Sequence, residues 1–122
     1  MATPVRSVAL LGATGSIGTQ TLDVLRRSPD HFKLVALSGG TRTQELLAIA
    51  REFHVPLVGV LNESDAQLVS AALPGVEVVI GDDGLDVLAR SADVVVNAVV
   101  GFAGLTATLA ALDAGKRLAL AN

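Results

Sequence analysis

Cysteine, tryptophan and tyrosine are absent from the 122 residues, and phenylalanine occurs only three times. Without cysteine, these residues cannot form disulfides or thiolate metal sites, which fits a reducing compartment. With so few aromatic side chains, the core has to be built from valine, leucine, isoleucine and alanine, in a chain that is 51% hydrophobic. Such aliphatic richness is typical of parallel sheets whose strands are buried on both faces by helices.

Strong charge and long apolar runs are also lacking. A net charge of -3 gives no electrostatic reason to expect a nucleic acid or an acidic membrane surface as a partner. No run reaches the roughly 18 apolar residues that a membrane span needs, and the first residues, MATPVRS, lack the apolar segment of a signal peptide. We therefore expect a soluble, cytoplasmic protein with one domain over residues 1–122.

Strand-like and helix-like segments alternate along the chain. The strands are expected at Val5–Leu11, Phe32–Leu37, Leu57–Leu61, Val76–Ile80, Asp93–Ala98 and Arg117–Leu120. The helices are expected at Ile17–Arg27, Thr41–Phe53, Ser64–Leu73, Asp83–Arg90 and Phe102–Ala114. The spacings Thr41-x-x-Gln44 and Ser64-x-x-Gln67 resemble capping boxes that open two of these helices.

This alternation predicts the fold class. Short connections between strands and helices favour an α/β, doubly wound (Rossmann-like) parallel sheet of about six strands with helices on both faces. We expect the Val76 strand to lie beyond the Leu57 strand at one edge of the sheet. The Asp93 strand should then pair beside the first strand. The point at which the strand order switches direction would then be flanked by the Gly-rich turn and the turn after Ala98.

The first connection, LLGATGSIG, contains glycines at positions 12, 15 and 18. Between a strand and a helix, Gly12 would permit a tight turn, Gly15 the close approach of a ligand to the backbone, and Gly18 the packing of the helix on the sheet. Backbone N–H groups and the positive end of the helix dipole suit a pyrophosphate there. The spacing differs from G-x-G-x-x-G, so a merely structural connection is the alternative interpretation.

The end of the second strand, Leu37-Ser38-Gly39-Gly40-Thr41-Arg42, indicates which dinucleotide binds. An NAD site usually has an acidic residue there for the ribose 2′-hydroxyl, and none is present. Arg42 offers donors for a 2′-phosphate instead, so the pattern favours NADPH. An ordinary solvated arginine is the alternative.

Further residues follow the later strands. Ala98 to Gly101 would lie along the cofactor toward its nicotinamide, although the glycines there also suit a plain loop, with Phe102 and Leu105 in the core. Asn122 follows the last strand at the same edge. Asp82 and Asp83 are interpreted as an exposed helix start rather than a cation site, and His31 and His54 as solvated loop residues at the opposite edge. No catalytic or metal-binding set is expected within these residues.

Two segments together resemble one known family. GATGSIGTQTLDVLRR (12–27) and NAVVGFAGLTATLAALDAGKRLALAN (97–122) are similar, in order and distance, to the N-terminal portion of the 1-deoxy-D-xylulose 5-phosphate reductoisomerases. That family continues with Lys-Glu-Ser after the position of Asn122. The resemblance implies isomerisation of 1-deoxy-D-xylulose 5-phosphate and its NADPH-dependent reduction to 2-C-methyl-D-erythritol 4-phosphate, in isoprenoid precursor synthesis.

The resemblance also implies roles for residues of this chain. Thr14, Gly15, Ser16 and Ile17 would hold the pyrophosphate and its ribose, Gly40, Thr41 and Arg42 would surround the 2′-phosphate, and Ala98, Val99 and Asn122 would complete the nicotinamide side. Family members often carry Lys-Asn where this chain has Thr41-Arg42, so the cation is displaced by one position.

The ligands of the divalent cation (Mg or Mn), the substrate-phosphate site and the lid belong to later parts of the family's chain. We therefore expect the 122-residue chain to bind NADPH without catalysis. The resemblance also implies that the full-length enzyme is a homodimer. Two alternatives stay open: the NAD(P)-binding half of another two-domain dehydrogenase, such as a semialdehyde dehydrogenase with a later catalytic cysteine, and a stand-alone, non-catalytic dinucleotide sensor.

Overall fold

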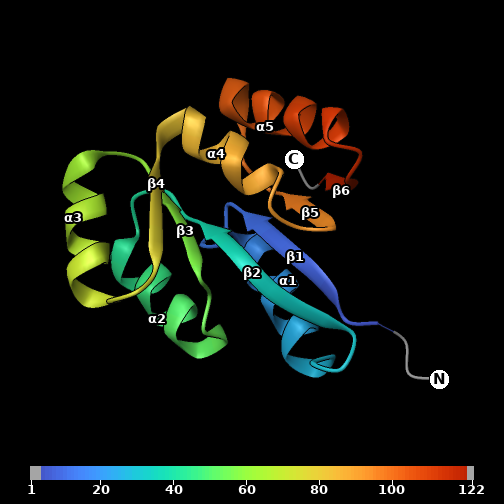
Figure 1. Ribbon diagram of the computed structural model, residues 1–122, viewed down its shortest axis with the longest axis horizontal. Helices are drawn as coiled ribbons and strands as arrows, with labels where there is room; N and C mark the ends of the chain where they lie inside the picture. The colour runs from blue at the N-terminus through green and yellow to red at the C-terminus, as the bar shows by residue number, and fades with distance from the viewer. Residues whose placement is uncertain (1–3, 121–122) are drawn as a thin grey trace.

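Strands and helices alternate throughout the computed structural model, which describes residues 4–120 except for the side chain of Phe102 (Figure 1). The strands are β1 (Arg6–Leu11), β2 (Phe32–Ser38), β3 (Leu57–Val60), β4 (Glu77–Ile80), β5 (Val94–Asn97) and β6 (Arg117–Leu120). The helices are α1 (Ser16–Arg27), α2 (Thr43–Phe53), α3 (Glu63–Ala72), α4 (Gly81–Ala89) and α5 (Gly101–Asp113).

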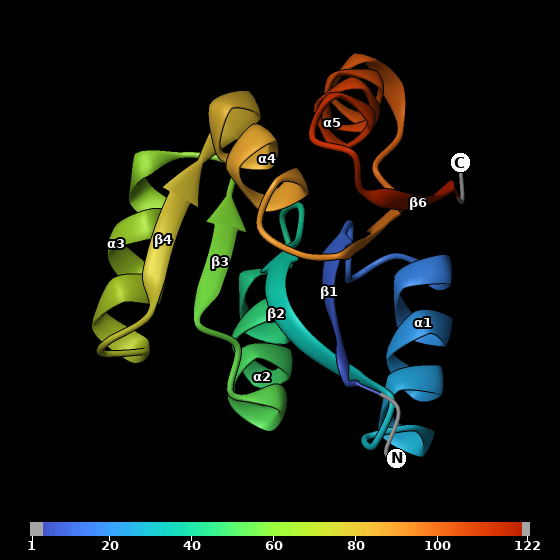
Figure 2. The same cartoon turned by 45° about the vertical axis from the view of Figure 1, so that its right-hand side comes forward.

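The six strands form one parallel sheet in the order β4-β3-β2-β1-β5-β6. Helices α1, α2 and α3 pack on one face of this sheet, and α4 and α5 pack on the other (Figure 2). The doubly wound fold and the strand order expected from the sequence are both confirmed. Because the chain moves one way from β1 through β4 and the other way from β5 to β6, the switch point lies between β1 and β5.

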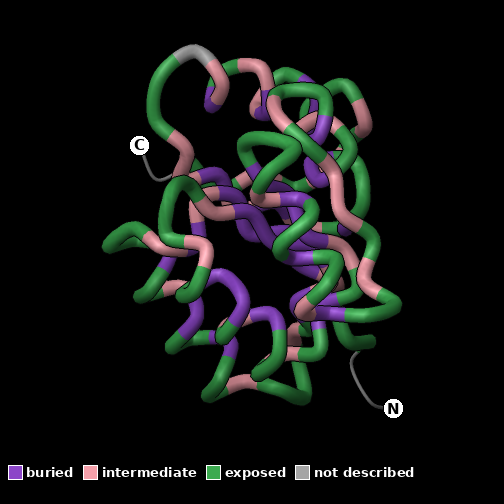
Figure 3. Tube along the Cα trace, turned by 90° about the vertical axis from the view of Figure 1, so that its left-hand side faces the viewer, coloured by how far each residue is buried: buried purple, intermediate pink, exposed green. Residues whose placement is uncertain are grey.

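Alternate residues of β1 supply both cores. Val8 and Leu10 face α1 and α2, whereas Ala9 and Leu11 face α4 and α5, and all four are at most 2% exposed. Buried segments accordingly run through the middle of the fold, and exposed ones form its outer turns (Figure 3). This two-sided burial explains why the strands read as continuous aliphatic runs in the sequence.

Helix α4 packs closely on the sheet because Gly59 of β3 has no side chain. A Cβ at Gly59 would lie 2.6 Å from Cδ1 of Leu88, which is fully buried. Leu88 thereby reaches deep into the second core, where truncation of such a leucine costs about 2–5 kcal/mol. This contact holds α4 across the sheet, with its first turn at the carboxyl edge.

The two expected capping boxes are wrong. Helix α2 begins at Thr43, after Arg42, and has no side-chain cap. Helix α3 begins at Glu63, and the side chain of Asn62 accepts the N–H of Asp65 at 2.9 Å. Asn62 has the extended backbone of an N-cap, which places its side-chain oxygen Oδ1 over the first turn. Ser64 already lies within the helix.

An ion cluster ties α1 to α2 away from the carboxyl edge. The Arg26 guanidinium donates to both carboxylate oxygens of Glu52, with Nη2 at 2.8 Å from Oε1, and to Asp23 at 2.9 Å. It also lies 5.5 Å from the ring centroid of Phe53. Hydrogen bonds from Arg26 lower the pKa of Glu52 in the folded chain.

We expect Glu52→Gln to weaken the fold in a pH-dependent way. Because the folded-state pKa of Glu52 is lowered, the Arg26–Glu52 pair stabilises the fold at pH values above the unfolded-state pKa of Glu52. This stabilisation is lost as the pH falls through the folded-state pKa. The side chain is 44% exposed, so the loss near neutral pH should stay below about 1 kcal/mol. Urea unfolding at neutral and acidic pH, with Glu77→Gln on β4 as a control, measures it; an equal loss at both pH values would contradict the assignment.

Candidate functional site

A cavity of about 260 Å³ lies at the carboxyl edge of the sheet. Its wall comes from the ends of β1, β2, β3 and β5 and from the starts of α4 and α5. Six of the residues predicted from the sequence line it: Gly12, Gly15, Gly40, Ala98, Val99 and Val100. The fold thus brings the three predicted glycine-rich or small-residue turns together at the switch point, where doubly wound sheets bind their ligands.

Gly12 makes the tight turn directly after β1. Its φ is +84°, and a Cβ there would lie 3.0 Å from the carbonyl carbon and oxygen of Ala98. The N–H groups of Gly12 and Ala13 both donate to the carbonyl of Ser38, at 3.2 and 2.8 Å, and that of Gly12 also lies 3.2 Å from Ser38 Oγ. Because these donors are engaged, Gly12 serves the turn rather than an anion.

The N-terminus of α1 is open to a ligand. Gly15 is the N-cap residue, no side chain caps the helix, and its first turn carries no acidic residue. The first N–H groups of a helix have no partners within it. Apart from its chain neighbours, a Cβ at Gly15 would meet only the Gly12 carbonyl oxygen, at 3.9 Å, and Gly15 lines the cavity. A negatively charged group would satisfy both the donors and the helix dipole.

Gly18 brings α1 close to the glycine turn. A Cβ at this position would lie 2.5 Å from the carbonyl oxygens of Gly12 and Ala13. The sequence interpretation had Gly18 pack the helix on the sheet, and the structure places the close contact on the turn itself. The absence of this side chain therefore sets how near the helix N-terminus comes to β1.

Acidic residues divide the five described helices into two groups. First turns with acidic residues occur in α2 (Glu45), α3 (Glu63 and Asp65) and α4 (Asp82 and Asp83). Helices α1 and α5 have neither acidic residues nor a side-chain cap at their starts. These two helices follow β1 and β5, the strands on either side of the switch point, so the uncompensated helix ends lie where the cavity is.

The end of β2 carries no acidic residue, as the sequence indicates. Gly39 and Gly40 line the cavity, whereas Thr41 and Arg42 are exposed beside it. The Arg42 side chain is 65% exposed and lies 3.7 Å from the carboxylate of Glu45, one helical turn on. Such an exposed i,i+3 pair is weak, so the guanidinium can exchange this partner for a ligand at little cost.

Two buried polar side chains, which the sequence reasoning missed, flank the glycine turn. Among the described residues, only Ser38 and Asn97 combine polarity with burial, at 4% and 0% exposure. Both are paired with Leu11, Ser38 on β2 and Asn97 on β5. A polar residue that closes an aliphatic strand just before a glycine-containing turn is the sequence signal that could have identified them.

The remaining predicted residues lie outside the cavity wall or outside the description. Thr14, Ser16 and Ile17 surround the start of α1 without lining the cavity, and Asn122 lies outside the described residues. Leu105, expected in the core, is 53% exposed on α5.

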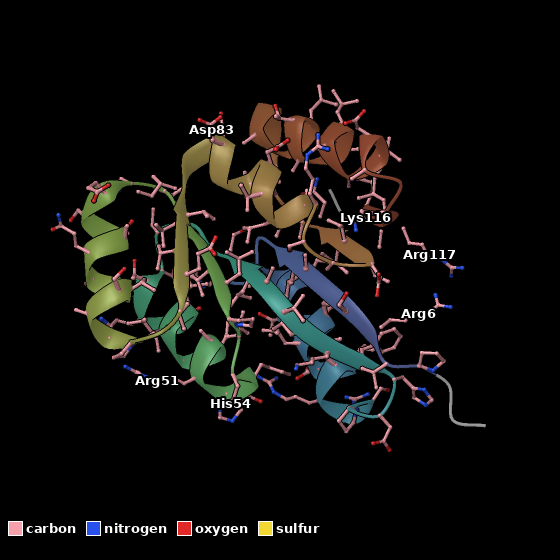
Figure 4. All side chains as sticks on the ribbon, in the orientation of Figure 1. Arg6, Arg51, His54, Asp83, Lys116 and Arg117 are labelled. Atoms are coloured by element: carbon pink, nitrogen blue, oxygen red, sulfur yellow. The ribbon has the colours of Figure 1, made fainter. Side chains whose placement is uncertain are left out.

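The acidic and histidine residues offer no further chemistry. Asp82 and Asp83 are both exposed in the first turn of α4, which confirms the expected helix start, and Asp82 borders the cavity. Figure 4 shows His54 and Arg51 at the opposite end of the fold from Asp83. Within residues 4–120, no three acidic or histidine side chains are placed to hold a metal ion. None of the helices in this part of the chain has the length and apolarity needed to cross a membrane.

Comparison with known proteins gives one consistent result. The profile of the 1-deoxy-D-xylulose 5-phosphate reductoisomerase family matches residues 8–122. The reductoisomerase of Bacillus cereus (strain Q1) is 45% identical over 120 residues, which make up 97% of this chain and 32% of that protein.

Two solved structures of reductoisomerases share the fold. One, in complex with magnesium, has a TM-score of 0.91 at 43% identity, over 98% of this chain and 31% of the other. The second, from Zymomonas mobilis in complex with NADPH, has a TM-score of 0.90 at 38% identity, over 98% of this chain and 32% of the other. The chain thus spans about a third of the length of these relatives.

Two alanine substitutions in the glycine turn should affect stability differently. Gly18→Ala places a Cβ against two backbone carbonyls and should lower the free energy of unfolding by about 1–3 kcal/mol. Gly15→Ala should change it little, because the reduced freedom of the unfolded chain offsets the weaker N-cap preference of alanine. Chemical denaturation measures both variants. Equal losses would show that α1 does not depend on its close approach to the turn.

Proposed function

The chain belongs to the 1-deoxy-D-xylulose 5-phosphate reductoisomerase family, and from this we propose that it is the NADPH-binding part of such an enzyme. The observation that carries the proposal is the uncapped, acid-free start of α1 beside a glycine-lined cavity at the switch point. The 38% identity to a reductoisomerase in complex with NADPH supports it. Among the alternatives from the sequence, the family match favours this one.

We place the cofactor's pyrophosphate at the first turn of α1, on the backbone of Gly15, Ser16 and Ile17. The position of Gly15 on the cavity wall supports this assignment, and so does the positive end of the helix dipole. The hydroxyls of Thr14 and Ser16 are assigned to the phosphate oxygens. In this arrangement Gly12 shapes the turn, and its own N–H stays on Ser38.

The adenosine 2′-phosphate is assigned to the end of β2. Gly40 leaves open space, since apart from its chain neighbours no heavy atom lies within 4 Å of where its Cβ would be. Thr41 and Arg42 follow it at the surface, and Arg42 would leave Glu45 for the phosphate. Ala98 and Val99, which line the cavity directly after β5, are assigned to the nicotinamide side. Asn122, assigned there as well, lies outside the described residues.

For the full-length protein we propose the family's reaction, isomerisation of 1-deoxy-D-xylulose 5-phosphate followed by reduction to 2-C-methyl-D-erythritol 4-phosphate. Bound NADPH supplies the hydride for the reduction. The residues of this chain bind and orient the cofactor. They do not fit the divalent cation, because no group of three acidic or histidine side chains converges within residues 4–120. A cytoplasmic location and a homodimer belong to the same proposal.

Gly15→Val should abolish NADPH binding without unfolding the chain. The side chain has room in the free protein, where the nearest atom to the Cβ is 3.9 Å away, but it occupies the space assigned to the pyrophosphate. Fluorescence titration with NADPH measures the affinity, and circular dichroism confirms the fold. Unchanged affinity in a folded variant would refute the pyrophosphate assignment.

Arg42→Ala should weaken the binding of NADPH and leave the binding of NADH nearly unaffected. A charge-assisted hydrogen bond is worth about 1.5–3 kcal/mol, and the exposure of Arg42 places the loss near the low end, about 10-fold. Arg51→Ala, which removes the same charge from the other end of α2, is the matched control. Equal losses for both cofactors, or an equal loss in the control, would contradict the specificity assignment.

We expect the 122-residue chain to bind NADPH without oxidising it. With 1-deoxy-D-xylulose 5-phosphate and Mg²⁺ or Mn²⁺, the NADPH absorbance should stay constant, because no carboxylate set for the cation is present in the described residues. The full-length Bacillus cereus relative serves as the positive control. Metal-dependent turnover by the purified 122-residue chain would show that its own carboxylates suffice.

A further inference from the structure

Asn97 closes β5 with a side chain that is fully buried and makes three hydrogen bonds. Its Nδ2 donates to the carbonyl of Gly104 and to Oγ1 of Thr108, both at 2.8 Å, and its Oδ1 accepts the N–H of Val99 at 3.1 Å. A neutral amide has two donor hydrogens and an acceptor oxygen with two lone pairs; here both hydrogens are donated and the oxygen accepts one bond. Neither an acid nor an aliphatic residue of this size can make the same set of bonds.

These bonds join the turn after β5 to the helix that follows it. Val99 lies in the turn, whereas Gly104 and Thr108 lie one and two turns into α5. On its other side the turn contacts β1: the N–H of Ala98 donates to the carbonyl of Leu11 at 2.9 Å. The turn is therefore hydrogen-bonded on both sides, and its residues Ala98 and Val99 line the cavity.

We propose that Asn97 is a positioning residue for the nicotinamide half of the dinucleotide, a role that rests on the proposed function. With the pyrophosphate on α1, a dinucleotide that crosses the switch point extends one half toward β2 and the other toward β5. The β5 half meets the wall that Asn97 fixes. Ser38 holds the turn on the β2 side through the N–H of Gly12. Each buried polar residue thus serves a different half of the ligand.

This proposal predicts a selective effect on affinity. Loss of the Asn97 bonds should loosen the wall on the β5 side and leave the α1 and β2 sites intact. The probe for the other half is adenosine 2′,5′-bisphosphate, which carries the adenosine and its 2′-phosphate but no nicotinamide. A general loss of stability would weaken both ligands alike, so the ratio of their affinities separates positioning from a merely structural role.

The experiment compares Asn97→Ala, Thr108→Val and Thr108→Ser by titration with both ligands. Asn97→Ala should lower the affinity for NADPH by about 10-fold, the equivalent of one or two buried hydrogen bonds. It should change the affinity for adenosine 2′,5′-bisphosphate by less than about 2-fold. Thr108→Val removes the hydrogen bond from Asn97 and should lower the affinity for NADPH, but not for adenosine 2′,5′-bisphosphate, by about 3-fold. Thr108→Ser keeps the hydroxyl and should bind as the unmodified chain does. The nicotinamide fluorescence of saturated NADPH should also fall in the first two variants.

Equal losses for the two ligands, or no loss for NADPH, would overturn the proposal. If Asn97→Ala does not fold, Thr108→Val decides the question by the same criterion. The unmodified chain separates this inference from its premise. If it binds neither ligand, the proposed function itself is wrong, whereas normal binding of both with an unselective effect of the variants refutes only the role of Asn97.

Discussion

The close packing of backbone around Gly12 is the constraint on which the rest of the site depends. The carbonyl of Ala98 lies 3.0 Å from where a Cβ at Gly12 would be, and Gly18 brings α1 even closer to the carbonyls of Gly12 and Ala13. Only chains without side chains at these two positions can bring the end of β1, the start of α1 and the turn after β5 into one small space. The cavity at the switch point exists because these three segments meet there.

Electrostatics then distinguishes the helix ends that surround this space. Helices α2, α3 and α4 carry carboxylates in their first turns, which offset their own dipoles. Helices α1 and α5 do not, and both begin next to the switch point. Their positive ends remain available to an anion, although the chain as a whole carries a net charge of -3. The overall negative charge is therefore compatible with an anionic ligand at these two helix starts, although Asp82 of α4 also borders the cavity.

Much of this architecture could be predicted from the sequence, because periodicity and glycine spacing are local signals. The aliphatic runs, the helical spacing and the first glycine turn led to the observed fold and strand order. Helix starts were less predictable, since Ser64 fits a capping pattern but Asn62 has the extended backbone that a cap requires. The sequence signal at Ser38 and Asn97, a polar residue at the end of an aliphatic strand, does not show which backbone groups these side chains contact. Their positions beside the glycine turn arise because β2 and β5 both pair with Leu11, far away in the sequence.

Backbone amide NMR during titration of the 122-residue chain with NADPH tests the central claim most directly, since it reports on every N–H group without any substitution. If the uncapped start of α1 holds the pyrophosphate, the largest changes will occur at Gly15, Ser16 and Ile17. Smaller changes will follow at the ends of β2 and β5, and the signals of Arg51 and His54 at the opposite end of the fold will stay in place (Figure 4). Changes centred on Arg51 and His54, or none at the start of α1 when NADPH is in excess, would contradict the account.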